Sequence, residues 1–180
     1  MKWSPSGLAP IALAVPAAVA PQLCAAKVFL SVEQAQKDMF GAATLAATPV
    51  VLTAAQQDRL KEVSSVPSPF QGNRVWRASD GGWFVVDEVV GKHELITYAV
   101  GLNADGTVRR VEVLEYRESY GGEVAGASWL KQFAGKSAAA PVKVGQDIAN
   151  ISGATLSSRH LADGVHRVLE LYASVLRTMG

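Results

Sequence analysis

Four apolar segments in the middle of the chain have the composition of β-strands. They are rich in Val, Ile, Trp and Tyr and span residues 74–78, 83–90, 95–102 and 107–116. The turn sequences between them are Asp80-Gly81-Gly82, Gly91-Lys92 and Asp105-Gly106. Turns this short join neighbouring antiparallel strands. The pattern therefore predicts an antiparallel sheet whose strands follow one another in sequence order.

Helical spacing of apolar residues appears on both sides of this region. Near the C-terminus one apolar stripe consists of Leu161, Val165, Val168, Leu169, Tyr172, Val175 and Leu176, with Arg159, Asp163, Glu170 and Arg177 off it. This stripe predicts an amphipathic helix that starts close after Thr155. Two earlier helices are predicted to begin at Ser31 and Thr53, where a hydroxyl precedes Gln by three residues, and to end near Gly41 and Val63.

These elements predict one α+β domain. An antiparallel β-sheet would carry two N-terminal helices and a C-terminal helix, and residues 117–141 would form a loop-rich connection. Within that connection, residues 137–140 are expected to be a short surface linker.

The first 26 residues have the pattern of a secretory signal peptide. Lys2 precedes an apolar run from 7 to 20, and Cys24-Ala25-Ala26 supplies small residues for cleavage. An uncleaved anchor is disfavoured because the run is short and contains Pro10 and Pro16. A lipoprotein at Cys24 is disfavoured because the preceding residues fit a lipobox poorly. We therefore expect a soluble periplasmic or extracytoplasmic domain over residues 27–180.

Charge and cysteine content exclude several classes of site. Of 17 Lys and Arg residues only Lys2 precedes the cleavage point, and none of the 16 Asp and Glu residues does, so the mature chain would carry no net charge. A nucleic-acid partner is therefore not expected. The mature chain would also lack cysteine, and with it disulfides and thiolate metal sites. The spacing of His93, His160 and His166 predicts no metal site, and all three are expected to be solvated.

The segment Ser152-Gly153-Ala154-Thr155 immediately precedes the C-terminal helix. The free N–H groups and the positive dipole end of a helix N-terminus favour an anion such as phosphate. The alternative is an ordinary turn with a helix N-cap. The tetrapeptide alone does not decide between these two interpretations.

The motif Ile151-Ser152-Gly153-Ala154-Thr155-Leu156-Ser157 resembles the flavinylation motif of the FMN-binding domain family. Residues 95–101 (LITYAVG), 111–122 (VEVLEYRESYGG) and 133–136 (FAGK) resemble that family in the same order. The family includes FMN-bearing subunits of the sodium-pumping NADH:quinone reductase and its ferredoxin-linked relative. The likeness is strong from residue 70 to the C-terminus and weaker back to residue 28.

This resemblance implies that Thr155 carries FMN through a phosphoester bond. A separate flavin transferase would supply the FMN group from FAD, with Mg²⁺ on that enzyme. The family motif usually has Asp three residues before the Ser, and this chain has Ala149 there, with Asp147 and Asn150 nearby. Because the transferase is commonly taken to recognise that acid, its absence bears on covalent attachment more than on flavin binding.

The remaining site residues follow from the same resemblance. Gly153 and Ala154 leave room for the phosphate, and Ser157 and Ser158 either donate to it or are solvated first-turn serines. The loop Glu118-Ser119-Tyr120-Gly121-Gly122 resembles the family's loop against the flavin ring, the alternative being a connector with Tyr120 packed on the sheet. Trp129 either stacks on the flavin or fills the core.

The expected function is electron transfer outside the cytoplasmic membrane, with a membrane-associated redox partner. Two alternatives remain at this point. One is a non-redox binding module of the same fold. The other is a flavin reductase acting on a soluble substrate, which would need an acid or base such as Glu118 or His93.

Overall fold

The computed structural model describes Met1 and residues 26–179, and residues 2–25 of the predicted signal peptide lie outside the described part. A six-stranded, wholly antiparallel sheet forms the centre of the domain, in the order β1-β6-β5-β4-β3-β2. The strands are β1 (Lys27–Val28), β2 (Leu45–Ala47), β3 (Val75–Ala78), β4 (Trp83–Val90), β5 (Leu95–Leu102) and β6 (Val108–Tyr116). The predicted antiparallel α+β fold is confirmed.

Among residues 26–179, three helices of two or more turns accompany the sheet. They are α1 (Val32–Phe40), α2 (Ala54–Ser64) and α4 (Thr155–Ser174). Shorter helical turns are η1 (Gly122–Ala125), α3 (Ala127–Leu130), η2 (Lys131–Phe133) and η3 (Leu176–Thr178). Among the described helices, none has both the length and the apolarity needed to cross a bilayer.

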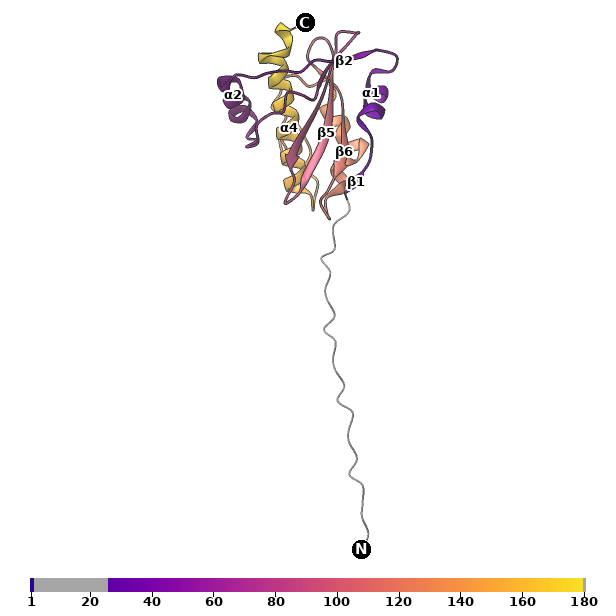
Figure 1. Ribbon diagram of the computed structural model, residues 1–180. Coiled ribbons are helices and arrows are strands. Elements are labelled where there is room, and N and C mark those ends of the chain that lie inside the picture. The colour runs from indigo at the N-terminus through magenta and orange to yellow at the C-terminus, as the bar shows by residue number, and fades with distance from the viewer. Residues whose placement is uncertain (2–25, 180) are drawn as a thin grey trace.

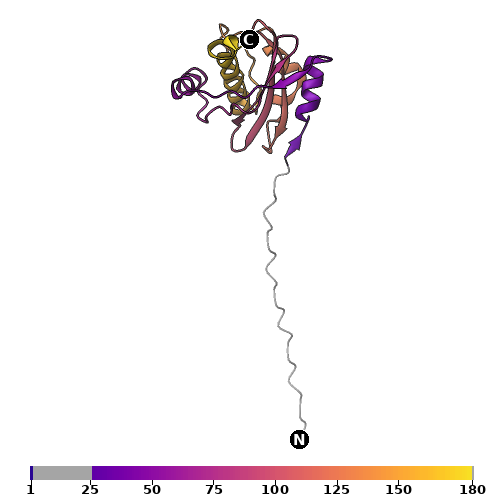
Figure 2. The same ribbon diagram turned by 45° about the horizontal axis from the view of Figure 1, so that its top comes forward.

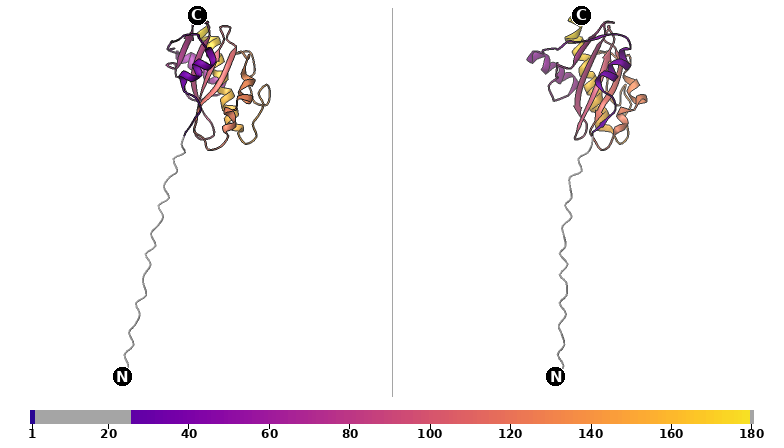
Figure 3. Two further views of the ribbon diagram at one scale, coloured as in Figure 1. Left: turned by 90° about the vertical axis from the view of Figure 1, so that its right-hand side faces the viewer. Right: turned by 45° about the vertical axis from the view of Figure 1, so that its right-hand side comes forward.

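The helices cover both faces of the sheet (Figure 1). On one face, Met39 and Phe40 of α1 pack in a cluster with Phe84 of β4. On the other face, α4 contacts β4 and β5, and α2 packs against α4. Figure 2 shows the same arrangement, with α2 lying outside α4, and Figure 3 shows the short turns of residues 122–133 beside β6.

The two N-terminal helices begin where the hydroxyl residues predict. Thr53 and Gln56 form the full capping box of α2, with each side chain bonded to the other's backbone. At α1 the Ser31 side chain accepts from the Gln34 N–H, whereas the Gln34 amide bonds to Asp38 instead of returning to Ser31. Ser31 therefore supplies half of the expected box, and Gly41 ends the helix as predicted.

Two elements were missed by the strand pattern. β1 and β2 are two and three residues long and form the two edges of the sheet. Leu45-Ala46-Ala47 contains no β-branched or aromatic residue, so its sequence has little strand preference. The helical turns in 122–133 were also missed, because each is too short to show a 3.6-residue repeat.

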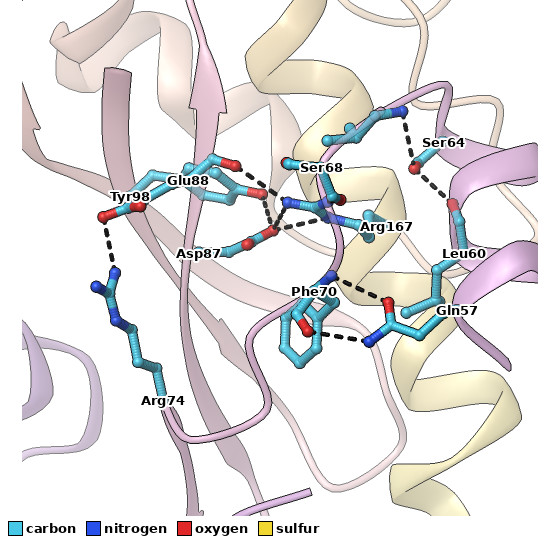
Figure 4. A network of polar contacts seen from close by, with 11 residues as sticks. Gln57, Leu60, Ser64, Ser68, Phe70, Arg74, Asp87, Glu88, Tyr98 and Arg167 are labelled. Atoms are coloured by element: carbon cyan, nitrogen blue, oxygen red, sulfur yellow. Dashed lines mark hydrogen bonds and ion pairs between the residues drawn. The ribbon is translucent and has the colours of Figure 1, made fainter. Parts of the chain in front are cut away.

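A buried ion pair fixes α4 against the sheet (Figure 4). Arg167 is 1% exposed, and its Nε and Nη2 donate to Asp87 Oδ2 on β4 at 2.9 and 2.7 Å. The Tyr98 hydroxyl on β5 donates to the same oxygen at 2.7 Å, and Arg167 Nη1 donates to the Ser68 carbonyl. The position of α4, whose first residue is Thr155, is therefore tied to two central strands.

The predicted apolar stripe of α4 is buried along its whole length. Glu170, which was expected off the stripe, is also buried and pairs with Arg59 of α2 at 2.5 Å. Glu170 lies off the apolar stripe, as predicted, and is buried because α2 covers that side of the helix.

Candidate functional site

A cleft of about 670 Å³ lies where β4 turns into β5 and where β6 ends. Three segments line it: the β4–β5 turn, the chain that follows β6, and the start of α4. Its lining residues are Lys92, His93, Glu118, Ser119, Tyr120, Gly153, Ala154, Thr155, Leu156 and Ser157. Ligand pockets commonly have volumes of roughly 300–1,000 Å³. The fold thus brings the motif at 152–155 and the loop at 118–120 to one cavity.

The first turn of α4 offers unpaired backbone donors to this cleft. Thr155 is the first helical residue and Ala154 the N-cap, whose side chain makes no capping bond. Thr155 is therefore not the N-cap. Within the described residues, no acceptor is bonded to the N–H groups of Thr155, Leu156 or Ser157. These donors and the dipole of a 20-residue helix favour a phosphate at this point.

The tight turn before α4 depends on Gly153. Its φ of 85° lies in the left-handed region, which side chains rarely adopt. Ser152 is exposed and does not line the cleft, although it belongs to the predicted set. The role of Gly153 is therefore conformational, and it keeps the backbone beside Thr155 open.

Thr155 lines the cleft and is half-buried. Its Oγ1 accepts a hydrogen bond of 3.2 Å from Asn150 Nδ2. Asn150 was not among the predicted site residues. Its contact arises from the turn at 151–154, which folds residue 150 back over the helix start, and no contiguous motif reveals such a contact.

Both serines of the first turn are buried, at 4% exposure for Ser157 and 0% for Ser158, so the interpretation as solvated serines was wrong. Ser157 Oγ lies 3.2 Å from the Tyr116 hydroxyl, which donates its own proton to the Tyr120 carbonyl at 2.5 Å. Since a carbonyl only accepts, Ser157 is the donor to Tyr116. Ser158 Oγ has the Thr155 carbonyl at 3.1 Å and Asn150 Oδ1 at 3.3 Å as acceptors, so neither serine has a proton directed at the cleft.

The loop after β6 forms the opposite wall. Tyr120 lines the cleft and is 86% exposed, so it is not packed on the sheet. Gly121 has a φ of 84°, and a Cβ there would lie 2.8 Å from the Tyr116 hydroxyl. Gly122 has open space around it. Neither glycine lines the cleft, and Gly121 instead shapes the loop that presents Tyr120.

The Glu118 carboxylate, at the wall of the cleft, binds backbone groups of the β4–β5 turn. Its Oε1 accepts from the backbone N–H groups of Lys92, His93 and Glu94. Partial burial opposes ionisation, but these three N–H groups outweigh it and hold the pKa of Glu118 below its usual value. A carboxylate held this way is a poor proton donor, which disfavours Glu118 as the acid of a flavin reductase.

The bonds from Glu118 fix the β4–β5 turn, which brings Lys92 and His93 to the cleft. His93 is exposed, as expected. The sequence predicted a turn here but not a cleft wall, because the anchoring carboxylate lies 24 to 26 residues away along the chain.

Trp129 and the other two histidines lie elsewhere. Trp129 is 7% exposed, packs edge-on against Phe133 with ring centroids 5.2 Å apart, and donates from Nε1 to the Ala149 carbonyl at 2.7 Å. It occupies the core and does not line the cleft. His160 and His166 are half-buried and therefore not fully solvated, and His160 Nδ1 lies 2.7 Å from both the Val90 and the Gly91 carbonyl.

The donor set of this cleft fits a flavin nucleotide. Its volume, the unpaired N–H groups of α4 and the hydroxyl of Thr155 suit a phosphate end, and the wall formed by Tyr120, Lys92 and His93 suits a polar aromatic ring. A comparison with curated proteins gives no match to the chain. A comparison with protein families matches residues 91–170 to the FMN-binding domain, a segment that includes every residue lining the cleft. Residues 91–170 thus match the FMN-binding domain family, and this match supports flavin binding by the domain.

Proposed function

We propose that this protein is an exported flavoprotein that carries FMN covalently on Thr155 and transfers electrons outside the cytoplasmic membrane. One observation carries the proposal. Thr155 lines the cleft of an FMN-binding domain, at the start of a helix whose first N–H groups have no acceptor within the described residues. An FMN phosphate joined to the Thr155 hydroxyl oxygen would lie beside those donors.

The residues of the chain supply binding and electrostatics, and FMN when bound supplies the electron-transfer chemistry. The backbone donors of the first turn of α4 hold negative charge at the phosphate end. The wall formed by Lys92, His93 and Tyr120 surrounds the rest of the cleft. Hydrogen bonds and positive charge near a flavin favour its reduced, more electron-rich form.

Export would explain why attachment is covalent. Reversible binding loses its cofactor where free FMN is scarce, whereas a phosphoester keeps it. The predicted cleavage after Ala26 leaves every described strand intact, since β1 begins at Lys27. The proposal implies two partners: a flavin transferase using FAD, and a membrane-associated redox protein that exchanges electrons with the flavin.

The test is intact-mass analysis of the exported protein made beside a competent flavin transferase. We expect a mature N-terminus at Lys27, one added FMN, and a yellow colour that persists through denaturation. Thr155→Ala removes the nucleophilic oxygen and should abolish the added mass. The fold should survive, since the Thr155 side chain makes one hydrogen bond, worth about 1 kcal/mol. Thr155→Ser retains the oxygen and should still be modified.

Ala149→Asp is the matched variant, because it restores the acid that the family motif usually has. If the wild type gains no mass and Ala149→Asp does, the missing acid limits attachment. If neither gains mass, the covalent proposal fails. A colourless protein with no flavin would favour the non-redox binding module, and steady-state turnover without a protein partner would favour the reductase.

A further inference from the structure

We propose that Asn150 is the positioning residue for the Thr155 hydroxyl when FMN is transferred to it. This inference rests on the proposed covalent attachment and concerns how the acceptor oxygen is held. Asn150 Nδ2 donates to Thr155 Oγ1 at 3.2 Å, the one side-chain hydrogen bond that the described residues give this hydroxyl.

The backbone beside Asn150 is held from two sides. Trp129 Nε1 donates to the Ala149 carbonyl at 2.7 Å, and the Ala149 N–H donates to Gln132 Oε1 at 2.8 Å. Both bonds come from the α3–η2 segment, which packs on β6. The side chain of Asn150 therefore extends from a backbone that is fixed against the sheet.

The amide of Asn150 is oriented by a second contact. Ser158 is 0% exposed, and its Oγ lies 3.1 Å from the Thr155 carbonyl and 3.3 Å from Asn150 Oδ1, so its one proton is shared between these two acceptors. With Oδ1 held in this way, Nδ2 points at Thr155. Ser158 thus contacts Thr155 both directly, at its carbonyl, and through Asn150, which gives a buried serine of α4 a role other than phosphate binding.

The attachment step requires Thr155 Oγ1 to be aimed at the phosphorus atom that it attacks. Thr155 Oγ1 forms a bond to the phosphorus of the FMN half of FAD while the bond from that phosphorus to the AMP oxygen breaks. AMP leaves, and the hydroxyl proton passes to a base on the transferase, with no change of oxidation state. The bond from Nδ2 occupies one lone pair of Oγ1 and leaves the other lone pair and the proton available. An amide is not a base, so Asn150 contributes orientation, and orientation errors alone cost large factors in rate.

Ala149 and Asn150 are expected to act on different kinetic parameters. Ala149 is exposed, and within the described residues its backbone alone makes hydrogen bonds, so an acid there would face an approaching transferase. Asn150 touches the reacting hydroxyl. A change at 149 should alter KM for the protein substrate, whereas a change at 150 should alter kcat.

The experiment uses protein made without transferase, then incubated with transferase, FAD and Mg²⁺ while intact mass reports the attachment rate. Asn150→Ala should lower kcat by roughly ten- to a hundredfold with KM close to wild type. Ser158→Ala should lower kcat less, and the double variant should be less slow than the product of the two single effects, because part of the effect of Ser158 passes through Asn150. Ala149→Asp is the control and should lower KM while leaving kcat unchanged.

Asn150 is exposed, so Asn150→Ala should keep its fold, which circular dichroism of the unmodified protein checks. A kcat for Asn150→Ala indistinguishable from wild type would overturn the inference, as would a change in KM alone. Fully additive effects of the two alanine variants would also overturn it. If neither the wild type nor Ala149→Asp ever gains FMN, the covalent proposal itself fails, which is a different outcome; if only Ala149→Asp gains FMN, the Asn150 comparison is made in that background.

Discussion

Tyr120 places an aromatic ring at the cleft without contributing to the core, being 86% exposed. Tyr120→Ala should therefore change the free energy of unfolding by no more than about 0.5 kcal/mol. With FMN bound in the cleft as proposed, the same variant should shift the absorbance and reduction potential of the flavin, because it alters the polarity of the cleft wall. Urea unfolding and spectroelectrochemistry measure the two effects. Val51→Ala, at a side chain 94% exposed and outside the cleft lining, is the control and should change neither.

Gly121 and Gly122 are adjacent but are expected to respond differently to substitution. Gly121→Ala forces a side chain into left-handed backbone, costing about 1–2 kcal/mol, and brings a Cβ to 2.8 Å from the Tyr116 hydroxyl. Gly122→Ala meets open space and should stay within about 0.5 kcal/mol of wild type. Thermal unfolding of the unmodified protein compares them. Equal losses in both variants would contradict the proposed role of Gly121.

Part of the site was predictable at this scale because it is contiguous. Thr155 and Gly153 occur in one tetrapeptide whose chemistry suits a phosphate. Residues that meet across the fold were not predictable. The hydrogen bond between Tyr116 and Ser157 joins residues 41 apart in the sequence. Because of it, Ser157 helps to hold the loop after β6 and is not the phosphate donor that the sequence suggested. No local pattern indicates which partner a serine finds at such a distance.

At the level of elements, the position of α4 depends on the buried ion pair between Arg167 and Asp87. Arg167 was not among the apolar helix residues from which α4 was predicted. Arg167→Ala would leave the Asp87 carboxylate, 6% exposed, without its cation, and should cost about 3–5 kcal/mol. Arg110→Ala removes a side chain that is 48% exposed in its pair with Glu112, and should cost at most about 1 kcal/mol. Urea unfolding at neutral pH compares the two variants. Similar small losses would show that the buried pair does not hold the helix.

The elements that were predicted well are those whose signals are local. The bounds of β4 and β5 match the predicted ranges, because Val-rich runs end there at glycine-containing turns. The capping residues Ser31 and Thr53 also fixed two helix starts. β1 and β2 depend on pairing with distant strands, and Arg167 meets Asp87 across 80 residues. Tertiary contacts of this kind leave no periodic signal in the sequence.

For the molecule as a whole, the lowered pKa values of several carboxyl groups predict that the folded state loses stability in acid. Partial burial raises the pKa of Asp147, but its ion pair with Lys136 and the N–H groups of Lys143 and Val142 outweigh this and lower it. The backbone N–H of Gly82 lowers the pKa of Asp80. A carboxylate with a depressed folded-state pKa stabilises the fold above its unfolded pKa, and that contribution disappears as pH falls through the folded value. Stability should therefore decline below about pH 4.

The contribution of Asp163 to stability should depend on pH in the opposite direction. Burial raises its pKa, so its stabilising contribution is present at low pH and is lost as pH rises through the folded value. Asp163→Asn should therefore gain stability at pH 7 relative to pH 3, whereas Asp147→Asn should lose about 1 kcal/mol at pH 7 and little at pH 3. Urea unfolding at both pH values measures this. If both variants changed the free energy of unfolding at pH 7 in the same direction, the opposite pKa shifts assigned to Asp163 and Asp147 would be contradicted.

The position of the edge strand β1 has a practical consequence for attaching this protein to an electrode. Lys27 pairs with Tyr116, whose hydroxyl touches Ser157 of the cleft, while the C-terminal end of α4 lies at the opposite end of the molecule (Figure 1). A surface linker joined at Lys27 would turn the cleft toward the electrode, and one joined after Met179 would turn it toward the solution. Cyclic voltammetry of the flavin-loaded protein should then give faster interfacial electron exchange with the first linkage, and faster oxidation by a dissolved acceptor with the second.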